Sequence, residues 1–310
     1  MAVVLISGGS GLVGTNLTRH LIERNFKVII LTRKKNKPSH HPNISYSYWN
    51  IQNKIIDTEA LKKADHIIHL AGAGVMDKKW TDDYKKTIVN SRTKSANLII
   101  KALKETAHKV KTFISASAIG YYGPDPHILT NKDGFAESDL PSNDFLGETC
   151  VLWEAASEPV KSMGIRRVVF RFGIVLANEG GALKEYKMPL KFGLATIFGS
   201  GKQMMSWIHQ DDLSRMICEG IENDYISGVY NAVAPEPVLQ KKFMTILGEK
   251  MRDKFFIPLH VPSFMLKLIL GQRSIELLKS ATVSGKKIKA TGFTFLYPSV
   301  RSALDELTKK

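Results

Sequence analysis

Apolar residues follow two different rhythms along the first half of the chain. Short apolar runs predict strands at residues 3–6, 27–32, 44–49, 67–70, 112–115 and 168–172. Between these runs, apolar residues at helical spacing predict helices at residues 12–24, 57–63, 82–106 and 145–162. Strands that alternate with helices in this way build a parallel sheet through right-handed crossovers. We therefore expect an α/β fold with a doubly wound parallel sheet.

The rhythm loosens after residue 175, where glycine and proline become frequent. Helical spacing returns at residues 211–221, 240–251, 262–270 and 299–307. We expect residues 176–310 to form a smaller region on the substrate side of the sheet, interleaved with the sheet domain of residues 1–175. The boundary between the two is approximate.

A glycine turn joins the first predicted strand to the first predicted helix, with Gly8, Gly11 and Gly14 three residues apart. Glycine has no Cβ, so the backbone can turn tightly and approach a phosphate, and the helix then directs its free N–H groups at the anion. A strand, such a turn and a helix, in this order, predict a Rossmann-type site for the pyrophosphate of a dinucleotide. The weaker alternative is a glycine-rich turn without a ligand.

The end of the second predicted strand distinguishes NAD from NADP. An acidic residue there holds the ribose 2′-hydroxyl of NAD, whereas a basic residue pairs with the 2′-phosphate of NADP. This chain has Thr32, Arg33, Lys34 and Lys35 at that point, and no Asp or Glu. Since a guanidinium can bind a phosphate through two hydrogen bonds, we expect NADP(H) as the cofactor. Arg33 as an ordinary exposed cation is the alternative.

Composition excludes several classes of protein. Hydrophobic residues make up 44% of the 310 residues, which is typical of a globular chain, and no apolar run is long enough to cross a bilayer. The net charge of +15 raises the question of a nucleic-acid partner. However, the lysines are scattered and no zinc-finger or RNA-binding motif accompanies them, so we favour a basic surface and expect neither a nucleic-acid nor a membrane partner.

Other sequence patterns are informative mainly by their absence. The N-terminus lacks a basic leader, so a cytoplasmic location is the default expectation. Two cysteines, Cys150 and Cys218, suggest no disulfide framework and no metal site. The motifs of serine hydrolases, zinc proteases and nucleotide hydrolases do not occur. A homodimer is one assembly that the sequence allows.

Several motifs together resemble a known family. They are the glycine turn, residues 69–73 (HLAGA), 115–118 (SASA), 119–123 (IGYYG), 153–157 (WEAAS), 171–176 (RFGIVL), 206–213 (SWIHQDDL), 228–238 (GVYNAVAPEPV) and 290–307 (ATGFTFLYPSVRSALDEL). As a set, they are similar to the extended short-chain dehydrogenases/reductases. Within these they resemble the atypical, sugar-nucleotide epimerase-like branch with a C-terminal domain of unknown function. The label "epimerase" follows from the fold and does not establish a reaction.

The resemblance implies a set of cofactor contacts. Those around the pyrophosphate would be Gly8, Ser10, Gly11, Leu12 and Val13; those at the adenosine end Thr32 and Arg33; and those along the ribose and nicotinamide Leu70, Ala71 and Gly72. Arg92 would reach the phosphates or the adenosine, and Val175 would close the nicotinamide pocket. Apolar packing for Leu70 and Val175, and a surface position for Arg92, are the alternatives.

The catalytic groups of such a family are incomplete in this chain. Ser117 matches the serine that binds the substrate oxygen, but the helix that should carry Tyr-x-x-x-Lys has Phe145 and Thr149 there. Shifting the register by one residue gives Leu146 and Cys150, which supply neither a phenol nor an amine. Three explanations remain: another residue donates the proton, water or substrate handles it, or the protein is not a catalyst.

Candidate donors lie close in sequence or by expected fold. Tyr121 and Tyr122 follow Ser117, and packing in the cleft wall is as good an explanation for them as catalysis. Asp125, Glu137 and His209 are further candidates, although a hydrogen bond beside a helix cap at Asp211 or Asp212 explains His209 better.

The leading hypothesis is an NADP(H)-dependent oxidoreductase or epimerase-like protein, acting on a small or nucleotide-linked carbonyl or alcohol. The alternative is a non-catalytic NADP(H)-binding regulatory protein, and a true sugar-nucleotide epimerase is a third hypothesis. We predict no metal, and the sequence does not identify the small-molecule substrate.

Overall fold

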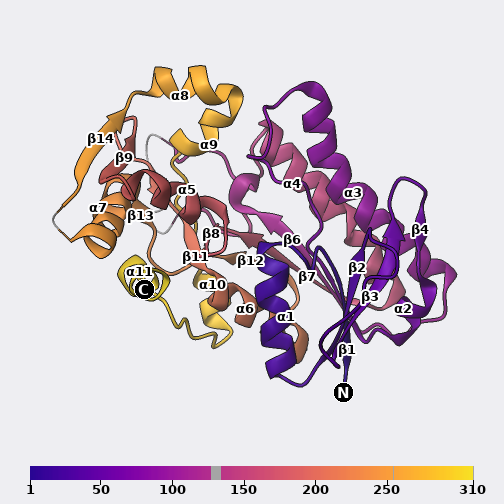
Figure 1. The fold of residues 1–310 in the computed structure, drawn as a ribbon. Coiled ribbons are helices and arrows are strands. Elements are labelled where there is room, and N and C mark those ends of the chain that lie inside the picture. The colour runs from indigo at the N-terminus through magenta and orange to yellow at the C-terminus, as the bar shows by residue number, and fades with distance from the viewer. Residues whose placement is uncertain (127–133, 254, 310) are drawn as a thin grey trace.

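The computed structural model describes residues 1–126, 134–253 and 255–309. Its centre is an eight-stranded sheet in the order β12-β7-β6-β5-β1-β2-β3-β4 (Figure 1). The strands are β1 (Val3–Ser7), β2 (Lys27–Thr32), β3 (Ile44–Asn50), β4 (Ile55–Ile56), β5 (His66–His69), β6 (Thr112–Ala118), β7 (Arg166–Phe172) and β12 (Gly228–Ala232). All neighbours run parallel except β4, which is antiparallel to β3.

Helices cover both faces of this sheet because successive strand residues point to opposite sides. Val4 and Ile6 of β1 pack toward α1 (Leu12–Glu23) and α6 (Gln210–Glu222). Leu5, between them, packs on the other side toward α2 (Thr58–Lys63) and α3 (Asp82–Glu105), and α4 (Phe145–Ala156) lies against α3. Figure 1 shows these two helix layers on either side of the strands. The predicted doubly wound α/β fold is confirmed.

Two predicted elements differ from the structure by three or more residues at one end. The helix expected at residues 145–162 stops at Ala156, and a 3₁₀ helix, Glu158–Met163, follows it. Pro159 stands at the start of this second segment, and Gly164, with a φ of 72°, ends it in the left-handed conformation. The strand expected at residues 112–115 continues to Ala118, because β7 pairs with it along its whole length.

The C-terminal lobe has its own core around Trp207, Phe243 and Leu304. Its elements are β8 (Ile174–Leu176), α5 (Gly181–Leu190), β9 (Leu194–Phe198), β10 (Met204–Met205), β11 (Trp207–His209), β13 (Val238–Leu239), α7 (Gln240–Arg252), β14 (Ile257–Val261), α8 (Ser263–Leu270), α9 (Ser274–Leu278), α10 (Lys286–Ala290) and α11 (Val300–Leu307). The loosened pattern after residue 175 predicted neither α5 nor β9.

The chain crosses between lobe and sheet more than once. After β11 it enters α6, which packs on α1, and then β12, which pairs with β7 at the edge of the main sheet. Residues beyond 175 therefore contribute to both parts of the molecule. Within the described residues, no helix combines the length and apolar character that a membrane span requires.

Candidate functional site

The glycine turn after β1 is shaped for a ligand that approaches the backbone. Gly8 has a φ of +78°, and a Cβ on it would lie 2.8 Å from the carbonyl carbon of Leu70. A Cβ on Gly14 would lie 2.3 Å from the carbonyl oxygen of Gly8, so neither position admits a side chain. Gly11 is the N-cap of α1, and no side chain caps that helix. The backbone N–H groups at its start are therefore available to an anion such as a pyrophosphate.

Three of the predicted pyrophosphate residues line one cavity at this turn. Ser10, Gly11 and Leu12 line a cavity of about 440 Å³ together with Glu179 and Gly180 from the loop after β8. Sequence reasoning missed these last two residues, because the loop carries no motif that marks it as part of the site.

The other predicted contacts with the pyrophosphate and the nicotinamide come from α1, from β8 and from the loop after β5. Val13 follows Leu12 in the first turn of α1. Val175 is in β8, and its carbonyl oxygen would lie 3.7 Å from a Cβ on Gly181. Ala71 follows Leu70 directly after β5, and a Cβ on Gly8 would lie 2.9 Å from the Ala71 nitrogen.

A second cavity of about 890 Å³ lies at Arg33, one of the residues predicted to contact the adenosine end. Its lining includes Arg33, just beyond the end of β2, with Lys54, Lys94 and Lys101. Thr32, before Arg33, accepts a hydrogen bond from the Lys34 nitrogen at its hydroxyl, 3.2 Å away. No acidic residue of the described chain lines this cavity, so the charged side chains of its lining are all positive. Sequence reasoning missed the three lysines because they come from a loop and from α3, far from Arg33 in the chain.

Arg92 is buried, which excludes the alternative of a surface position, and its contact with the phosphates or the adenosine stays a prediction. Its guanidinium donates hydrogen bonds to the carbonyl oxygens of Ala73, at 3.0 Å, and Ile88, at 2.9 Å, and lies 4.7 Å from the centre of the Trp153 ring. A Cβ on Gly72 would lie 3.1 Å from the Arg92 Cζ atom. Arg92 therefore supports the loop after β5 from within the protein.

His69, at the end of β5, connects this loop to its surroundings. The Ser7 hydroxyl donates to its Nδ1 at 2.6 Å, and its Nε2 donates to the Arg92 carbonyl at 3.2 Å. The ring is fully buried, and burial lowers the pKa of His69 to about 4. His69 is therefore a neutral structural residue that ties β1, β5 and α3 together.

The face of α4 that meets β6 carries no proton donor of the expected kind. The Cys150 thiol donates to the Ala118 carbonyl at 3.6 Å, and a Cβ on Gly120 would lie 3.4 Å from the Leu146 Cβ. The structure thus selects the register with Leu146 and Cys150 over that with Phe145 and Thr149. Burial raises the pKa of Cys150 to about 11, so this thiol is neutral.

Ser117 is part of a buried hydrogen-bond network between β6, α4 and β7. Its hydroxyl donates to the Glu154 carboxylate at 2.7 Å. Arg171 forms an ion pair with the same carboxylate through Nε, at 2.8 Å, and Nη2, at 3.0 Å. The Ser117 side chain is buried and serves Glu154 in this structure. The hydrogen bond that was expected to hold the substrate oxygen is used within the protein.

The network continues to Tyr122, which corrects its candidacy as a proton donor. The Tyr122 hydroxyl donates to the Asn231 side-chain oxygen at 2.8 Å and accepts from Arg171 at 2.8 Å. The ring stacks on Phe135 and is fully buried, and burial raises the pKa of Tyr122 to about 12. Tyr122 is therefore a packing and hydrogen-bonding residue.

Tyr121 differs from its neighbour. Its side chain is only partly buried, and its ring centre lies 3.4 Å from the Arg171 Cζ atom. Among the described residues, nothing hydrogen-bonds to its hydroxyl. Of the two predicted tyrosines, Tyr121 is the one whose phenol is left available.

The other candidate acids are occupied. Asp125 accepts hydrogen bonds from the side chain of Ser280, at 2.7 Å, and the backbone of Thr282, at 2.7 Å. Glu137 accepts from the Asn231 backbone nitrogen at 2.8 Å. These carboxylates hold the C-terminal lobe and β12 against the loop after β6.

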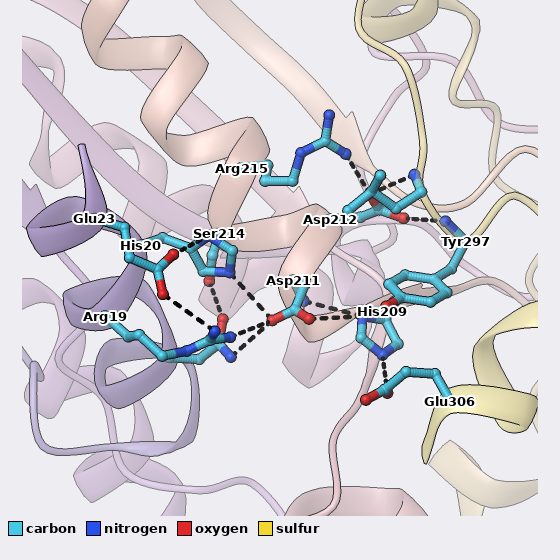
Figure 2. Close-up of polar contacts among 12 residues, drawn as sticks. Arg19, His20, Glu23, His209, Asp211, Asp212, Ser214, Arg215, Tyr297 and Glu306 are labelled. Carbon is cyan, nitrogen blue, oxygen red and sulfur yellow. Dashed lines mark hydrogen bonds and ion pairs between the residues drawn. The ribbon is translucent and has the colours of Figure 1, made fainter. Parts of the chain in front are cut away.

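His209 is itself the N-cap of α6, which corrects the expected cap at Asp211 or Asp212. Its Nδ1 accepts from the Asp211 nitrogen at 3.1 Å, and its Nε2 lies 3.0 Å from the Glu306 carboxylate of α11 (Figure 2). Because both ring nitrogens are engaged and the ring is fully buried, His209 is structural.

The two aspartates beside His209 join three distant segments. Asp211 accepts from Arg19, at 2.9 Å, and from His20, at 3.1 Å, both on α1, and the hydrogen bond from His20 is the main cause that lowers the pKa of Asp211 (Figure 2). Asp212, fully buried, accepts from the backbone nitrogens of Leu296, at 2.8 Å, and Tyr297, at 2.9 Å. The motif of residues 206–213 therefore fastens α6 to α1 and to the C-terminal tail.

Lys279 is a buried lysine beside the start of α4 that sequence reasoning missed. Its side chain is 6% exposed, and its Nζ lies 3.7 Å from a carboxylate oxygen of Asp144, the N-cap of α4. Within the described residues, this Nζ has no hydrogen-bond partner. Nearby, burial raises the pKa of Glu276. No spacing in the sequence marks Lys279, because it reaches α4 from the C-terminal lobe.

The described residues include no group of three or more His, Cys, Asp or Glu side chains able to hold a metal ion.

Comparisons with known proteins agree with this arrangement. The model of the NAD dependent epimerase/dehydratase family matches residues 4–232, and the model of a domain of unknown function, DUF1731, matches residues 261–307. An epimerase family protein of Staphylococcus saprophyticus is 38% identical over 308 residues, which are 98% of this chain and 98% of that protein.

Two solved structures illustrate the fold. The human epimerase family protein SDR39U1, isoform 2, solved with NADPH, has a TM-score of 0.84 and 29% identity, over 99% of each chain. UDP-glucuronic acid 4-epimerase from Bacillus cereus, solved with UDP-glucuronic acid and NAD, has a TM-score of 0.78 and 19% identity, over 99% of this chain and 98% of that one. At that identity the second likeness concerns the fold alone.

Proposed function

Because this chain belongs to the NAD dependent epimerase/dehydratase family, we propose that it is an NADP(H)-dependent oxidoreductase acting on a small or nucleotide-linked carbonyl or alcohol. The observation that carries the proposal is the pairing of a side-chain-free glycine cradle with a cationic cavity at Arg33. The human relative solved with NADPH supports the same cofactor.

The cofactor would be held by backbone at one end and by cations at the other. Gly8, Gly11 and the first turn of α1 would bind the pyrophosphate, and Arg33 with Lys94 would bind the 2′-phosphate. The loop after β5, braced by Arg92, would lie along the nicotinamide. When bound, the nicotinamide supplies or accepts a hydride.

On the substrate side, the proton must come from groups other than a Tyr-x-x-x-Lys pair. Tyr121 and Lys279 are two described groups with unused donors near α4, and we propose that they meet the substrate oxygen. Residues 1–175 would then supply most of the cofactor site, and residues 176–310 the substrate side. The setting we propose is the cytoplasm, with no nucleic-acid or membrane partner.

A second function, a non-catalytic NADP(H)-binding protein, is favoured by one specific observation. The α4 face toward β6 is apolar and thiol-bearing, and Ser117 is bonded to Glu154. A protein that only reports cofactor levels would need the cradle and Arg33, but no substrate-side donor.

Two measurements separate these possibilities. The first is titration of the purified protein with NADPH and NADH, followed by fluorescence and by thermal stabilisation. We expect tight NADPH and weak NADH binding, and absence of binding by either would end the proposal. The second is NADPH consumption in the presence of a panel of carbonyl compounds. If none of them is turned over, the non-catalytic NADP(H)-binding function is favoured.

For a compound that is turned over, Tyr121→Phe and Lys279→Met are compared with Tyr225→Phe, an exposed tyrosine in the turn between α6 and β12. Loss of a general acid lowers turnover by about 100-fold or more. We expect such a loss for Tyr121 or Lys279 with unchanged NADPH affinity, and none for Tyr225. Full activity of both variants would show that water or substrate handles the proton.

A further inference from the structure

Two helices from different parts of the molecule begin at the same cavity. α1 starts after its N-cap residue Gly11 and α5 after its N-cap residue Gly180, and no side chain caps either helix. Both N-cap residues line the cavity of about 440 Å³ at the glycine turn. The two helix starts lie against each other, because a Cβ on Gly181 would lie 3.0 Å from the Leu12 Cδ2 atom. The backbone N–H groups that each helix leaves unpaired at its start are therefore close together.

The charge at these two helix starts differs from that at a third. α6 also borders the cavity, through its first residue Gln210, but Asp211 and Asp212 stand in its first turn and the His209 side chain caps it. The first turns of α1 and α5 contain no acidic residue. A negative charge in the first turn balances the positive end of the helix dipole, so this end stays unbalanced in α1 and α5. An anion in the cavity would supply the missing charge.

The cavity lining has one cation and one anion among its side chains, Arg19 and Glu179. Arg19 donates hydrogen bonds to Asp211, at 2.9 Å, and to Glu23, at 3.4 Å. The Glu179 side chain is exposed to solvent. Preference for an anion in this cavity therefore comes from the two helix starts and not from a surplus of basic side chains.

Gln210 is a buried amide without a partner at this cavity. It is 9% exposed, and its side chain forms no hydrogen bond within the described chain. The other two buried glutamines are satisfied: Gln203 donates to the Leu277 carbonyl at 3.0 Å, and Gln240 donates to the Thr196 carbonyl at 3.0 Å. Since an unpaired buried amide costs free energy, Gln210 is suited to a ligand that accepts its hydrogen bond.

The cofactor that we propose for this chain has two linked phosphates, and the start of α1 accounts for one of them. We propose that the N-terminus of α5 and the side-chain amide of Gln210 bind the other phosphate. We call Gly11, Gly180 and Gln210 the pyrophosphate clamp. The Gln210 amide would donate to a phosphate oxygen and gain the partner that the protein does not provide. This inference rests on the proposed function, because it concerns the pyrophosphate of the same cofactor.

The first test is Gln210→Leu, which keeps the approximate size of the side chain and removes its hydrogen-bonding groups. Loss of a hydrogen bond to a charged group changes affinity by about tenfold or more, so fluorescence titration should show at least that loss for NADPH. The matched control is Gln272→Leu, an exposed glutamine in the 3₁₀ helix Gly271–Arg273, which should bind NADPH like the wild type. Thermal melts without cofactor check that both variants are folded.

The second test changes the charge at the start of α5. Gly180 has an extended φ of 171°, and a Cβ there would lie 3.6 Å from the Leu12 Cδ1 atom, so the position admits a side chain. Gly180→Asp places a negative charge beside the clamp, and Gly180→Asn places a neutral group of nearly the same size there. We expect Gly180→Asp to bind NADPH at least about tenfold more weakly than Gly180→Asn, because only the carboxylate repels a phosphate.

The third test uses inorganic pyrophosphate, which probes the clamp without the rest of the cofactor. Calorimetry should show that pyrophosphate binds the wild type, that NADPH displaces it, and that Gln210→Leu weakens its binding by about tenfold. Adenosine 2′-phosphate contains no pyrophosphate, so it should bind the wild type and Gln210→Leu with equal affinity.

Three results would overturn the proposal. They are NADPH affinities of Gln210→Leu and Gly180→Asp equal to those of their controls, a wild type that does not bind pyrophosphate, and pyrophosphate that binds together with NADPH. Failure of the proposed function gives a different result. In that case the wild type would bind pyrophosphate through Gln210 but would not bind NADPH, so the clamp would stand and the cofactor would not.

Discussion

The proposed cofactor side and the proposed substrate side of this molecule differ in the atoms that form them: backbone atoms on the first side and side-chain atoms on the second. At the glycine turn, backbone makes the site: Gly8 and Gly14 matter because they lack a side chain, and α1 contributes N–H groups. On the proposed substrate side, where β6 meets α4, side chains take the place of backbone, and many of them bond to one another in a buried network. A backbone site can be identified from local sequence, whereas a side-chain site depends on which distant residues meet.

The contrast bears on how each side tolerates change. At the glycine turn, a single added Cβ changes the backbone that meets the ligand, and we expect the effect to be a loss of NADPH affinity. In the network of Ser117, Glu154 and Arg171, removal of one charge leaves the other charge buried without a partner. We expect the effect to be a lower free energy of unfolding. Four predictions test this difference, from the largest expected effect to the smallest.

Glu154→Gln would leave the Arg171 guanidinium, whose side chain is 3% exposed, without its counter-charge. Breaking a buried pair in this way costs about 3–5 kcal/mol in the free energy of unfolding, which urea denaturation measures. The control is Glu59→Gln. Glu59 forms an ion pair with Lys62, and its side chain is 64% exposed, so loss of this ion pair should cost less than about 1 kcal/mol. Equal small losses in the two variants would contradict the structural role, as would a loss of NADPH affinity in folded Glu154→Gln.

The stability of the fold should depend on His69 between pH 6.5 and pH 4. Burial lowers the pKa of His69 to about 4, from 6.5 in the unfolded chain, so in this window the unfolded state binds the additional proton. The contribution of neutral His69 is fully present above pH 6.5, is lost as the pH falls toward 4, and amounts to roughly 3 kcal/mol.

The measurement compares urea denaturation of wild type and His69→Asn at several pH values. The stability advantage of the wild type should shrink as the pH falls through this window. A constant difference between the two proteins would show that His69 titrates alike in the folded and unfolded states.

Gly8→Ala should abolish measurable NADPH binding, with a loss of at least about 100-fold, since the added Cβ would meet the Leu70 and Ala71 backbone. Gly164→Ala is the matched control, because Gly164 also has a positive φ, of 72°, but a Cβ there would have no atom within 4 Å. Both variants bear the same backbone strain, of about 1–2 kcal/mol. Fluorescence titration should therefore separate them, and equal NADPH affinities would dissociate the turn from the cofactor.

Arg33→Asp should weaken NADPH binding by about 1.5–3 kcal/mol and NADH binding little, because a charge-assisted contact to the 2′-phosphate is lost. Lys34→Asp makes the same charge change at the next residue, which does not line the cavity. Parallel titrations of the two variants with both cofactors provide the comparison. Equal losses for NADPH and NADH in Arg33→Asp would place Arg33 away from the 2′-phosphate.

The comparison also explains which sequence predictions succeeded. The strands at β1, β2 and β5 are buried on both faces and therefore read as continuous apolar runs, and the glycine turn sits between two strongly periodic elements. The register of α4 was not predictable, because Phe145 and Leu146 are equally apolar. Only the contact between Cys150 and Ala118 shows which of them faces β6.

By itself, the amino-acid sequence determined the doubly wound sheet, the glycine turn and the basic residue at the end of β2, since the alternation of strands and helices and the geometry of glycine are set by local pattern. Only the tertiary structure decided which partners the polar side chains bind. Ser117 and Tyr122 became parts of a buried network, His209 became a helix cap, and Lys279 reached α4 from a lobe more than a hundred residues away in the chain. The physical reason is that a buried polar group must find a partner wherever the fold places one, and sequence spacing does not record that meeting.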